Sequence, residues 1–345
     1  MLDIKKFTLE NGLRIIVNED FSTPFSVMNI LYDVGSKDED PEKTGFAHLF
    51  EHLMFGGSVN IPIYDIPLQR VGGENNAFTN TDITNYHITL PTENIETAFW
   101  LESDRMLNLD FSQKNLDTQK NVVIEEFKQR YLNKPYGDVW LYLRPLSYKV
   151  HPYQWPTIGK EISHIQKATL NDVKDFFYAH YAPNNAIMVL SGSVTFETVK
   201  QLSEKWFAPI PTRNVIPRNL PKEPEQKEHR RLTIERNVPF DSIYLTFHMC
   251  DRMDKNYHAS DLISDILSNG KSSRLYQNLV QKKKLFSEIN AYISGEMDEG
   301  LFIFSGNLMK GVPLITAEKA IWDEIEKLKN GYVFEYELVK VRKKK

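Results

Sequence analysis

The sequence predicts an α+β fold with two related domains, each an antiparallel sheet with helices packed on one face. Strand-like runs alternate with amphipathic helical runs along most of the chain. After a proline-rich stretch, the order strand, helix, strand, strand, helix echoes part of the order before it, which indicates a diverged internal duplication. The 345 residues are enough for two domains. We expect a first domain over residues 1–207, a linker over 208–230 and a second domain over 231–345.

The first domain opens with a hairpin pattern, in which residues 7–10 and 13–17 flank the turn signal Asn11-Gly12. A charged loop then leads to the apolar helical run FAHLFEHLMF at 46–55, which Gly56-Gly57 closes. The stretch GGENNAFTNTD before residue 83 is rich in turn-forming residues. The other elements expected here are strands over 25–34, 83–90 and 186–192 and helices over 95–108, 116–131 and 197–207.

The expected linker is rich in proline and poor in apolar side chains, a composition that favours an extended chain. Residues 334–338 at the end resemble the start of a helix, so we expect the second domain to be atypical or incomplete there. The elements expected after the linker are strands over 232–235, 242–249, 288–294 and 301–305 and helices over 258–268 and 316–329.

Composition excludes several classes of protein. The formal charge of −4 gives no reason to expect nucleic acid or an anionic membrane as a partner. A single cysteine, Cys250, excludes an intrachain disulfide, and we expect it to be buried within the strand-like run SIYLTFHMC. No segment approaches the roughly 20 apolar residues of a membrane span. The N-terminus lacks the apolar core of a signal peptide, which favours a cytoplasmic location, or a periplasmic one if a leader was removed.

The run His48-Leu49-Phe50-Glu51-His52 is the strongest chemical signal in the chain. Two imidazoles four residues apart lie on one helix face, where they can share a metal ion. The reversed order His-x-x-Glu-His is typical of a class of zinc hydrolases. The alternative is a surface helix that carries two histidines by chance. The apolar flanks argue against it, because half-buried imidazoles without a partner would be costly.

Catalytic zinc takes three protein ligands, so a third ligand should come from another element. The helical run NVVIEEF offers Glu125 and Glu126. Periodicity leaves open which of the two faces inward, because adjacent helical residues differ by about 100° in direction. Glu51 would accept the proton of the water that zinc activates. The pattern therefore predicts a hydrolase, most simply a peptidase, with one Zn²⁺ per chain.

Several ordered blocks resemble the pitrilysin and mitochondrial processing peptidase family, also called inverzincins. GFAHLFEHLMFGGS resembles the zinc helix of that family, GGENNAFTNTDITNYHI the strand that follows it, and QKNVVIEEF the segment of the third ligand. Further matching blocks are HPYQWPTIGKEI, YAPNNAIMVLSGSV and, after the linker, SNGKSSRLYQNLV. The resemblance covers most of the chain and implies a zinc endopeptidase that cleaves unfolded peptides or targeting segments.

Residue by residue, the resemblance implies that His48, His52 and Glu126 are the zinc ligands and that Glu51 is the catalytic base. It selects Glu126 over Glu125 because the family's ligand is the eighth residue of the block that begins at Gln119. The family commonly has a supporting glutamate at this first position, so Gln119 is a departure that can alter metal affinity. The resemblance also implies that substrate adds as a strand along Asn76, Ala77, Phe78 and Thr79.

A second departure lies in the second domain. The family uses an arginine and a tyrosine, seven residues apart, to grip the substrate and to help stabilise the oxyanion. The corresponding positions here are Val280 and Ser287, which offer neither a charged nor a phenolic donor. The sequence thus keeps the metal half of the site and lacks the substrate clamp.

Three interpretations follow from the resemblance. In the first, the chain is the zinc-bearing subunit of a heterodimer, and a homologous partner subunit supplies the Arg/Tyr clamp. In the second, it is a peptidase active alone or as a homodimer. In the third, it is a non-catalytic structural subunit like the core proteins of respiratory complexes. Those typically have broken zinc motifs, whereas all three ligands and the base are present here.

Overall fold

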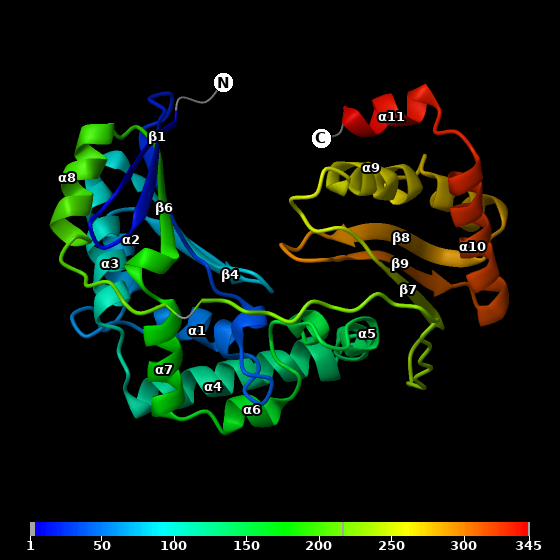
Figure 1. Ribbon diagram of the computed structural model, residues 1–345, viewed down its shortest axis with the longest axis horizontal. Coiled ribbons are helices and arrows are strands. Elements are labelled where there is room, and N and C mark those ends of the chain that lie inside the picture. The colour runs from blue at the N-terminus through cyan, green and yellow to red at the C-terminus, as the bar shows by residue number, and fades with distance from the viewer. Residues whose placement is uncertain (1–3, 216, 344–345) are drawn as a thin grey trace. The chain divides into compact units, whose positions relative to one another are not determined.

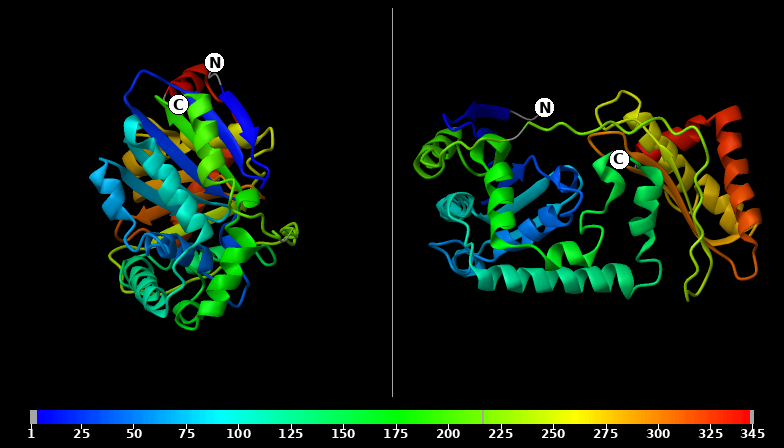
Figure 2. Two further views of the ribbon diagram at one scale, coloured as in Figure 1. Left: turned by 90° about the vertical axis from the view of Figure 1, so that its left-hand side faces the viewer. Right: turned by 60° about the horizontal axis from the view of Figure 1, so that its bottom comes forward.

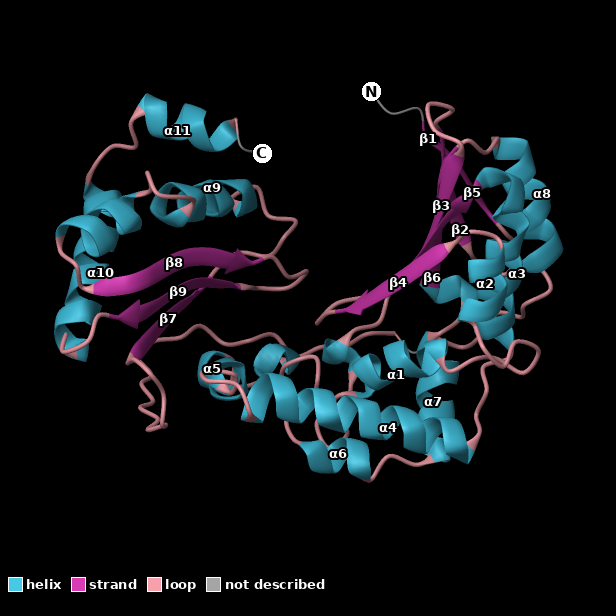
Figure 3. Ribbon diagram, turned by 180° about the vertical axis from the view of Figure 1, so that it is seen from behind, coloured by secondary structure: helices cyan, strands magenta, loops and turns pink. Residues whose placement is uncertain are grey.

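The computed structural model describes residues 4–215 and 217–343, which fall into two compact units that meet in sequence at Pro224 and Glu225. Each unit has a sheet of its own, with helices packed on it (Figure 3). Each unit also has its own cluster of buried hydrophobic side chains. The α+β prediction with two related domains is confirmed.

The sheet of the first unit has six strands in the order β1-β2-β6-β3-β5-β4, so that β4 lies at an edge. Neighbouring strands are antiparallel except for β2 and β6, which are parallel. In β3 and β6 every second residue is buried, as expected for a sheet covered on one face. The strands are β1 (Ile4–Thr8), β2 (Arg14–Glu19), β3 (Phe25–Tyr32), β4 (Glu74–Thr79), β5 (Thr84–Pro91) and β6 (Ala186–Gly192).

The helices of this unit position the site. Helices α3 and α8 pack against one another and contact the sheet through β5 and β2 (Figures 1 and 2). Helix α1 lies between β4 and α4 and contacts both, which brings its side chains within reach of each. The helices are α1 (Phe46–Phe55), α2 (Asp65–Arg70), α3 (Ile95–Leu107), α4 (Gln113–Phe127), α5 (Val139–Ser147), α6 (Ile162–Gln166), α7 (Leu170–His180) and α8 (Phe196–Trp206).

Shorter helical turns complete the first unit. Helix α4 continues directly into a π-helical segment, Lys128–Leu132. Such segments are rare and occur frequently at functional sites. The 3₁₀ turns are Ser36–Asp38, Thr92–Asn94, Pro152–Gln154 and Pro183–Asn185.

The second unit repeats part of the first. Its sheet has the order β7-β9-β8, with both pairs antiparallel, just as β3-β5-β4 are ordered and paired in the first unit. Helix α9 follows β7 as α1 follows β3. This shared order supports the predicted duplication. The elements are β7 (Ser242–His248), α9 (Tyr257–Ser268), a π-helical segment (Tyr276–Lys282), β8 (Phe286–Ser294), β9 (Leu301–Leu308), α10 (Leu314–Asn330) and α11 (Glu335–Arg342).

Several predicted details are wrong. The chain between β1 and β2 is not a two-residue turn but a loop over 9–13, because the Asn11 side chain turns away to donate to the carbonyl oxygens of Phe207 and Ile210. The turn-rich stretch contains strand β4. No strand forms over 232–235, where every residue is exposed. Cys250 is only partly buried, because β7 ends at His248.

The proline-rich stretch has no helix or strand among its described residues between α8 and β7, but residues 208–224 are held on the first unit. Arg213 donates to the carbonyl oxygens of Tyr181 and Met106. The Glu223 carboxylate accepts three backbone N–H groups, from residues 149–151. We call residues 208–224 the strap. Within the described part of the chain, no helix is long and apolar enough to cross a membrane.

Candidate metal centre

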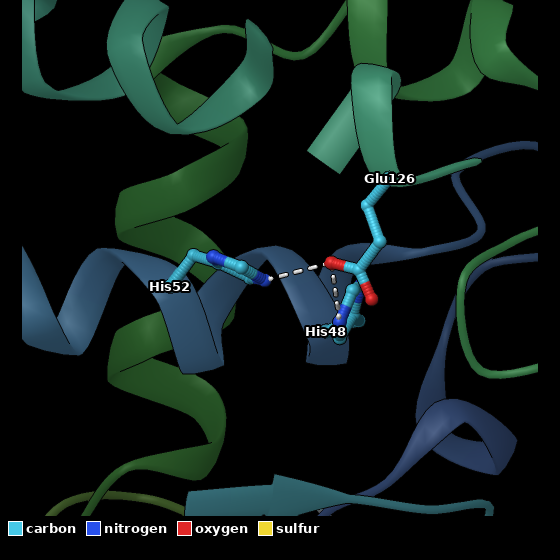
Figure 4. Close-up of side chains that lie close together, drawn as sticks. All are labelled: His48, His52 and Glu126. Carbon is cyan, nitrogen blue, oxygen red and sulfur yellow. Dashed lines mark ion pairs between the residues drawn. The ribbon is translucent and has the colours of Figure 1, made fainter. Parts of the chain in front are cut away.

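Three side chains that can bind metal converge where α1 faces α4 (Figure 4). The Nε2 atoms of His48 and His52 lie 3.6 Å and 3.3 Å from Oε2 of Glu126. The potential ligand atoms of the three residues all lie within 4.8 Å of one another. Two imidazole nitrogens and one carboxylate oxygen are a donor set that zinc takes in catalytic sites. The three residues therefore fit one zinc ion and leave further coordination positions for water or substrate.

Helix α1 is held at its N-terminus by a buried carboxylate that is distant in sequence. Glu39 accepts the backbone N–H groups of Gly45 and Ala47 at 2.9 Å and 2.8 Å, and also the indole N–H of Trp155. It thereby satisfies donors that the first turn of a helix leaves free. Gly45 has a φ of +91°, and a Cβ atom there would lie 2.6 Å from the carbonyl oxygen of Ile158. The sequence thus fixes the N-cap of the helix, Gly45, three residues before His48.

The protonation states suit a metal site. Burial lowers the pKa of His48 to about 4, so its imidazole is neutral at neutral pH, the form that binds metal. The hydrogen bond with His52 is the main cause that lowers the pKa of Glu126. Nδ1 of His48 is buried and has no hydrogen-bond partner among the described residues. If Nε2 binds a metal ion, Nδ1 would carry the ring proton.

Glu51 lies beside these three side chains but is not part of the group that could hold a metal ion. Its Oε2 accepts a hydrogen bond of 2.6 Å from the Thr79 hydroxyl group on β4. Burial is the largest influence on the Glu51 carboxyl group and raises its pKa. A carboxylate fixed by a neutral donor, with its pKa moved toward neutrality, has the properties of a general base.

A pocket of about 360 Å³ contains this group of side chains. Of the predicted substrate-binding residues, Ala77, Phe78 and Thr79 line it, whereas Asn76 is exposed on β4 outside it. Gln119 is half-buried on α4, two turns before Glu126, and does not line the pocket. All residues that line the pocket belong to the first unit; they are His48, Glu51, His52, Ala77, Phe78, Thr79, Glu126, Arg130, Tyr131, Thr157 and Ile158.

Four of these residues were not expected from the sequence. Arg130 and Tyr131 come from the π-helical segment, and no local pattern in the sequence marks such a segment. The sequence does offer one signal for Arg130: it follows Glu126 by four residues, one helical turn, which places the two side chains side by side on a helix. Thr157 and Ile158 lie within the block HPYQWPTIGKEI, for which we expected no role in the site.

The two positions that replace the clamp lie in the second unit and make local contacts there. Val280 lies in the π-helical segment and packs against the core of this unit. Ser287 is exposed on β8 and donates to the carbonyl oxygen of Asn307 at 3.1 Å. Nearby Arg274 is paired with Glu337 at 2.7 Å. These contacts account for all three residues without a role in binding substrate.

Comparison with known proteins finds relatives that are named as peptidases. A family model described as insulinase (peptidase family M16) matches residues 14–136, and one described as the peptidase M16 inactive domain matches residues 167–345. The zinc protease PqqE of Helicobacter pylori is 33% identical over 341 residues, covering 97% of this chain and 77% of that protein. The mitochondrial-processing peptidase subunit beta of Saccharomyces cerevisiae is 28% identical over 220 residues, covering 63% of this chain and 47% of the yeast protein.

A solved structure agrees with these matches. The crystal structure of a protease from Helicobacter pylori aligns with a TM-score of 0.94 at 32% identity. The alignment covers 99% of this chain and 83% of that one.

Proposed function

We propose that this chain, which belongs to the peptidase M16 family, is a zinc-dependent endopeptidase that hydrolyses unfolded peptides. Membership of the family confirms the resemblance expected from the sequence blocks. The observation that carries the proposal is the convergence of His48, His52 and Glu126 beside Glu51 in one pocket. All four lie within residues 14–136, the part that matches the insulinase model, and outside the part matched by the inactive-domain model.

The proposed chemistry assigns one task to each group. Zinc, when bound by the three ligands, would lower the pKa of a water molecule and polarise the scissile carbonyl group. Glu51 accepts the proton of the attacking water and delivers it to the leaving amine. The Thr79 hydroxyl group orients Glu51 by its hydrogen bond. Because β4 also forms a wall of the pocket, the same strand places substrate and base side by side.

The edge of the sheet supports a way to bind substrate. Among the described residues, β4 pairs with β5 on one side only, so its other side is available to an added strand. Phe78 is 47% exposed and lines the pocket, where it can contact an apolar side chain of a peptide. Main-chain pairing does not select a sequence strongly, which fits extended, unfolded peptides as the substrate class.

A partner subunit is the second part of the proposal. Val280 and Ser287 cannot act as the clamp, and the relative in yeast is by its name a subunit of a processing peptidase. We infer that a homologous chain with the arginine and the tyrosine completes the site. Mixing the purified chain with such a homologue from the same genome should raise peptide hydrolysis. High activity of the chain alone, with no gain on mixing, would instead favour a homodimer or an independent peptidase.

Replacement of the base tests the proposed function. We expect Glu51→Gln to retain stoichiometric zinc, because Glu51 is not a ligand, and to lower hydrolysis of an unstructured fluorogenic peptide by about 10²- to 10⁴-fold. The matched control is Glu125→Gln, which changes an exposed glutamate of α4 that is paired with Lys128. It should leave both the zinc content and the rate of hydrolysis unchanged. Undiminished turnover by Glu51→Gln would reject the mechanism, and a wild-type protein without zinc would reject the ligand set.

A further inference from the structure

Arg130 contacts the oxygen of Glu126 that the histidines do not face. Its Nη1 atom lies 3.0 Å from Oε1 of Glu126, whereas Oε2 is the atom near the two imidazoles. The two carboxylate oxygens therefore have separate partners. Arg130 lies four residues after Glu126, in the π-helical segment that continues α4.

This contact restricts a side chain that would otherwise turn. The terminal torsion of glutamate has a broad, roughly two-fold distribution, so either oxygen of an unrestrained carboxylate can face a metal. Partners of metal ligands fix the orientation of those ligands, and their loss commonly costs about 10- to 100-fold in metal affinity or activity. Arg130 is 71% exposed and Glu126 is 17% exposed. An ion pair this open to solvent contributes little to stability, so a test by stability alone would not detect it.

We propose that Arg130 is a positioning residue for the zinc ligand Glu126: it holds Oε1 so that Oε2 faces His48 and His52. This proposal rests on the proposed function, because it assumes that the three residues bind zinc. It assigns Arg130 no contact with the reacting atoms. A purely electrostatic role of Arg130 would have the opposite effect, because a positive charge near the site opposes the binding of a cation.

The affinity for zinc distinguishes these roles without any measurement of activity. We expect Arg130→Met to bind zinc about tenfold or more weakly than the wild type in a competition with a chromophoric chelator. Methionine keeps a long unbranched side chain but has no charge and no donor. The matched control is Lys128→Met, which removes the neighbouring ion pair with Glu125, two exposed side chains on the same stretch of helix. We expect this variant to bind zinc as the wild type does.

A double-mutant cycle tests whether Arg130 acts through Glu126. In a Glu126→Gln background the carboxylate is already lost, so Arg130→Met should cause no further loss of zinc affinity. Thermal melts of the zinc-free proteins establish that each variant is folded. Unchanged or tighter zinc binding by folded Arg130→Met would overturn the proposal, as would losses that add in the double variant. A wild-type chain that binds no zinc would instead reject the proposed function itself.

Discussion

The hydroxyl group of Thr79 links the substrate-binding edge to the catalytic base. Its hydrogen bond of 2.6 Å to Glu51 joins β4 to α1. A hydrogen bond to a charged group contributes about 1.5–3 kcal/mol, and 1.4 kcal/mol corresponds to a tenfold change in rate. The orientation of Glu51 thus depends on the strand along which a peptide would add.

We expect Thr79→Val to lower kcat for peptide hydrolysis by about tenfold, because valine has the shape of threonine without the donor. The zinc content, measured by elemental analysis, should stay at one ion per chain. Thr79→Ser keeps the hydroxyl group and should restore most of the rate. Full activity of the valine variant would show that Glu51 needs no such partner.

At the scale of single residues, sequence reasoning could name His48, Glu51 and His52 because their spacing alone places them on one turn of a helix. It could not choose between Glu125 and Glu126 without the resemblance, because that choice depends on how α4 is rotated against α1. The contact of Thr79 with Glu51 joins side chains by tertiary geometry, and no periodic pattern in one sequence contains that information. The contact of Arg130 with Glu126 spans one helical turn, but the spacing alone does not show which carboxylate oxygen Arg130 meets.

Among the elements, α1 depends on a capping group outside itself. Glu39 accepts the N–H groups of Gly45 and Ala47. Burial raises the pKa of Glu39, whereas the hydrogen bonds from these two donors lower it. We expect Glu39→Ala to lower the free energy of unfolding by about 2–4 kcal/mol, because it leaves two buried N–H groups without an acceptor. Chemical denaturation measures this loss. Zinc affinity should fall as well, because His48 lies in the first turn of α1.

The matched control for this substitution is Glu42→Ala, which changes an exposed residue of the same loop. We expect a change in unfolding free energy within about 0.5 kcal/mol. Equal stability of the two variants would contradict the assigned role of Glu39.

Elements with a clear periodicity were predicted well, as for β3, α1, β6 and α10. Helix α7 was missed although Thr169 and Asp172 form a capping box at its start, a signal present in the sequence. Helix α5 contains Pro145, which a sequence pattern counts against a helix. The run at 232–235 alternates like a strand, but its backbone finds no partner strand. Local pattern cannot supply that partner.

For the whole molecule, the strap sets where the first unit ends. The stretch between residues 207 and 223 forms hydrogen bonds with three separate parts of the first unit. These parts are Asn11, Tyr181 and residues 149–151. Arg218 adds ion pairs with Asp33 and Asp38. The proline-rich composition predicts an extended chain but not its attachment, since prolines and scattered charges give no sign of what they contact.

We expect a fragment of residues 1–224 to fold and to bind zinc, because it contains a complete core and all three ligands. A fragment of residues 1–207 should melt about 5–10 °C lower, since it lacks the contacts of Arg213, Arg218 and Glu223. Extension to residue 230 should add nothing to the melting temperature. Calorimetry of the three fragments measures the difference, and equal melting temperatures of the two shorter ones would show that the strap is not part of the folded unit.

The free edge of β4 also bears on how the chain avoids self-association. An exposed strand edge can pair with another copy and start aggregation. On β4, the first residues are polar, and the Asn76 side chain accepts the backbone N–H of Ala77 at 2.8 Å. The N–H group of Ala77, with which a neighbouring molecule could pair, is thereby bonded until an incoming strand displaces the Asn76 side chain. The Asn76 amide thus covers one of the main-chain donors through which this edge could pair with another copy.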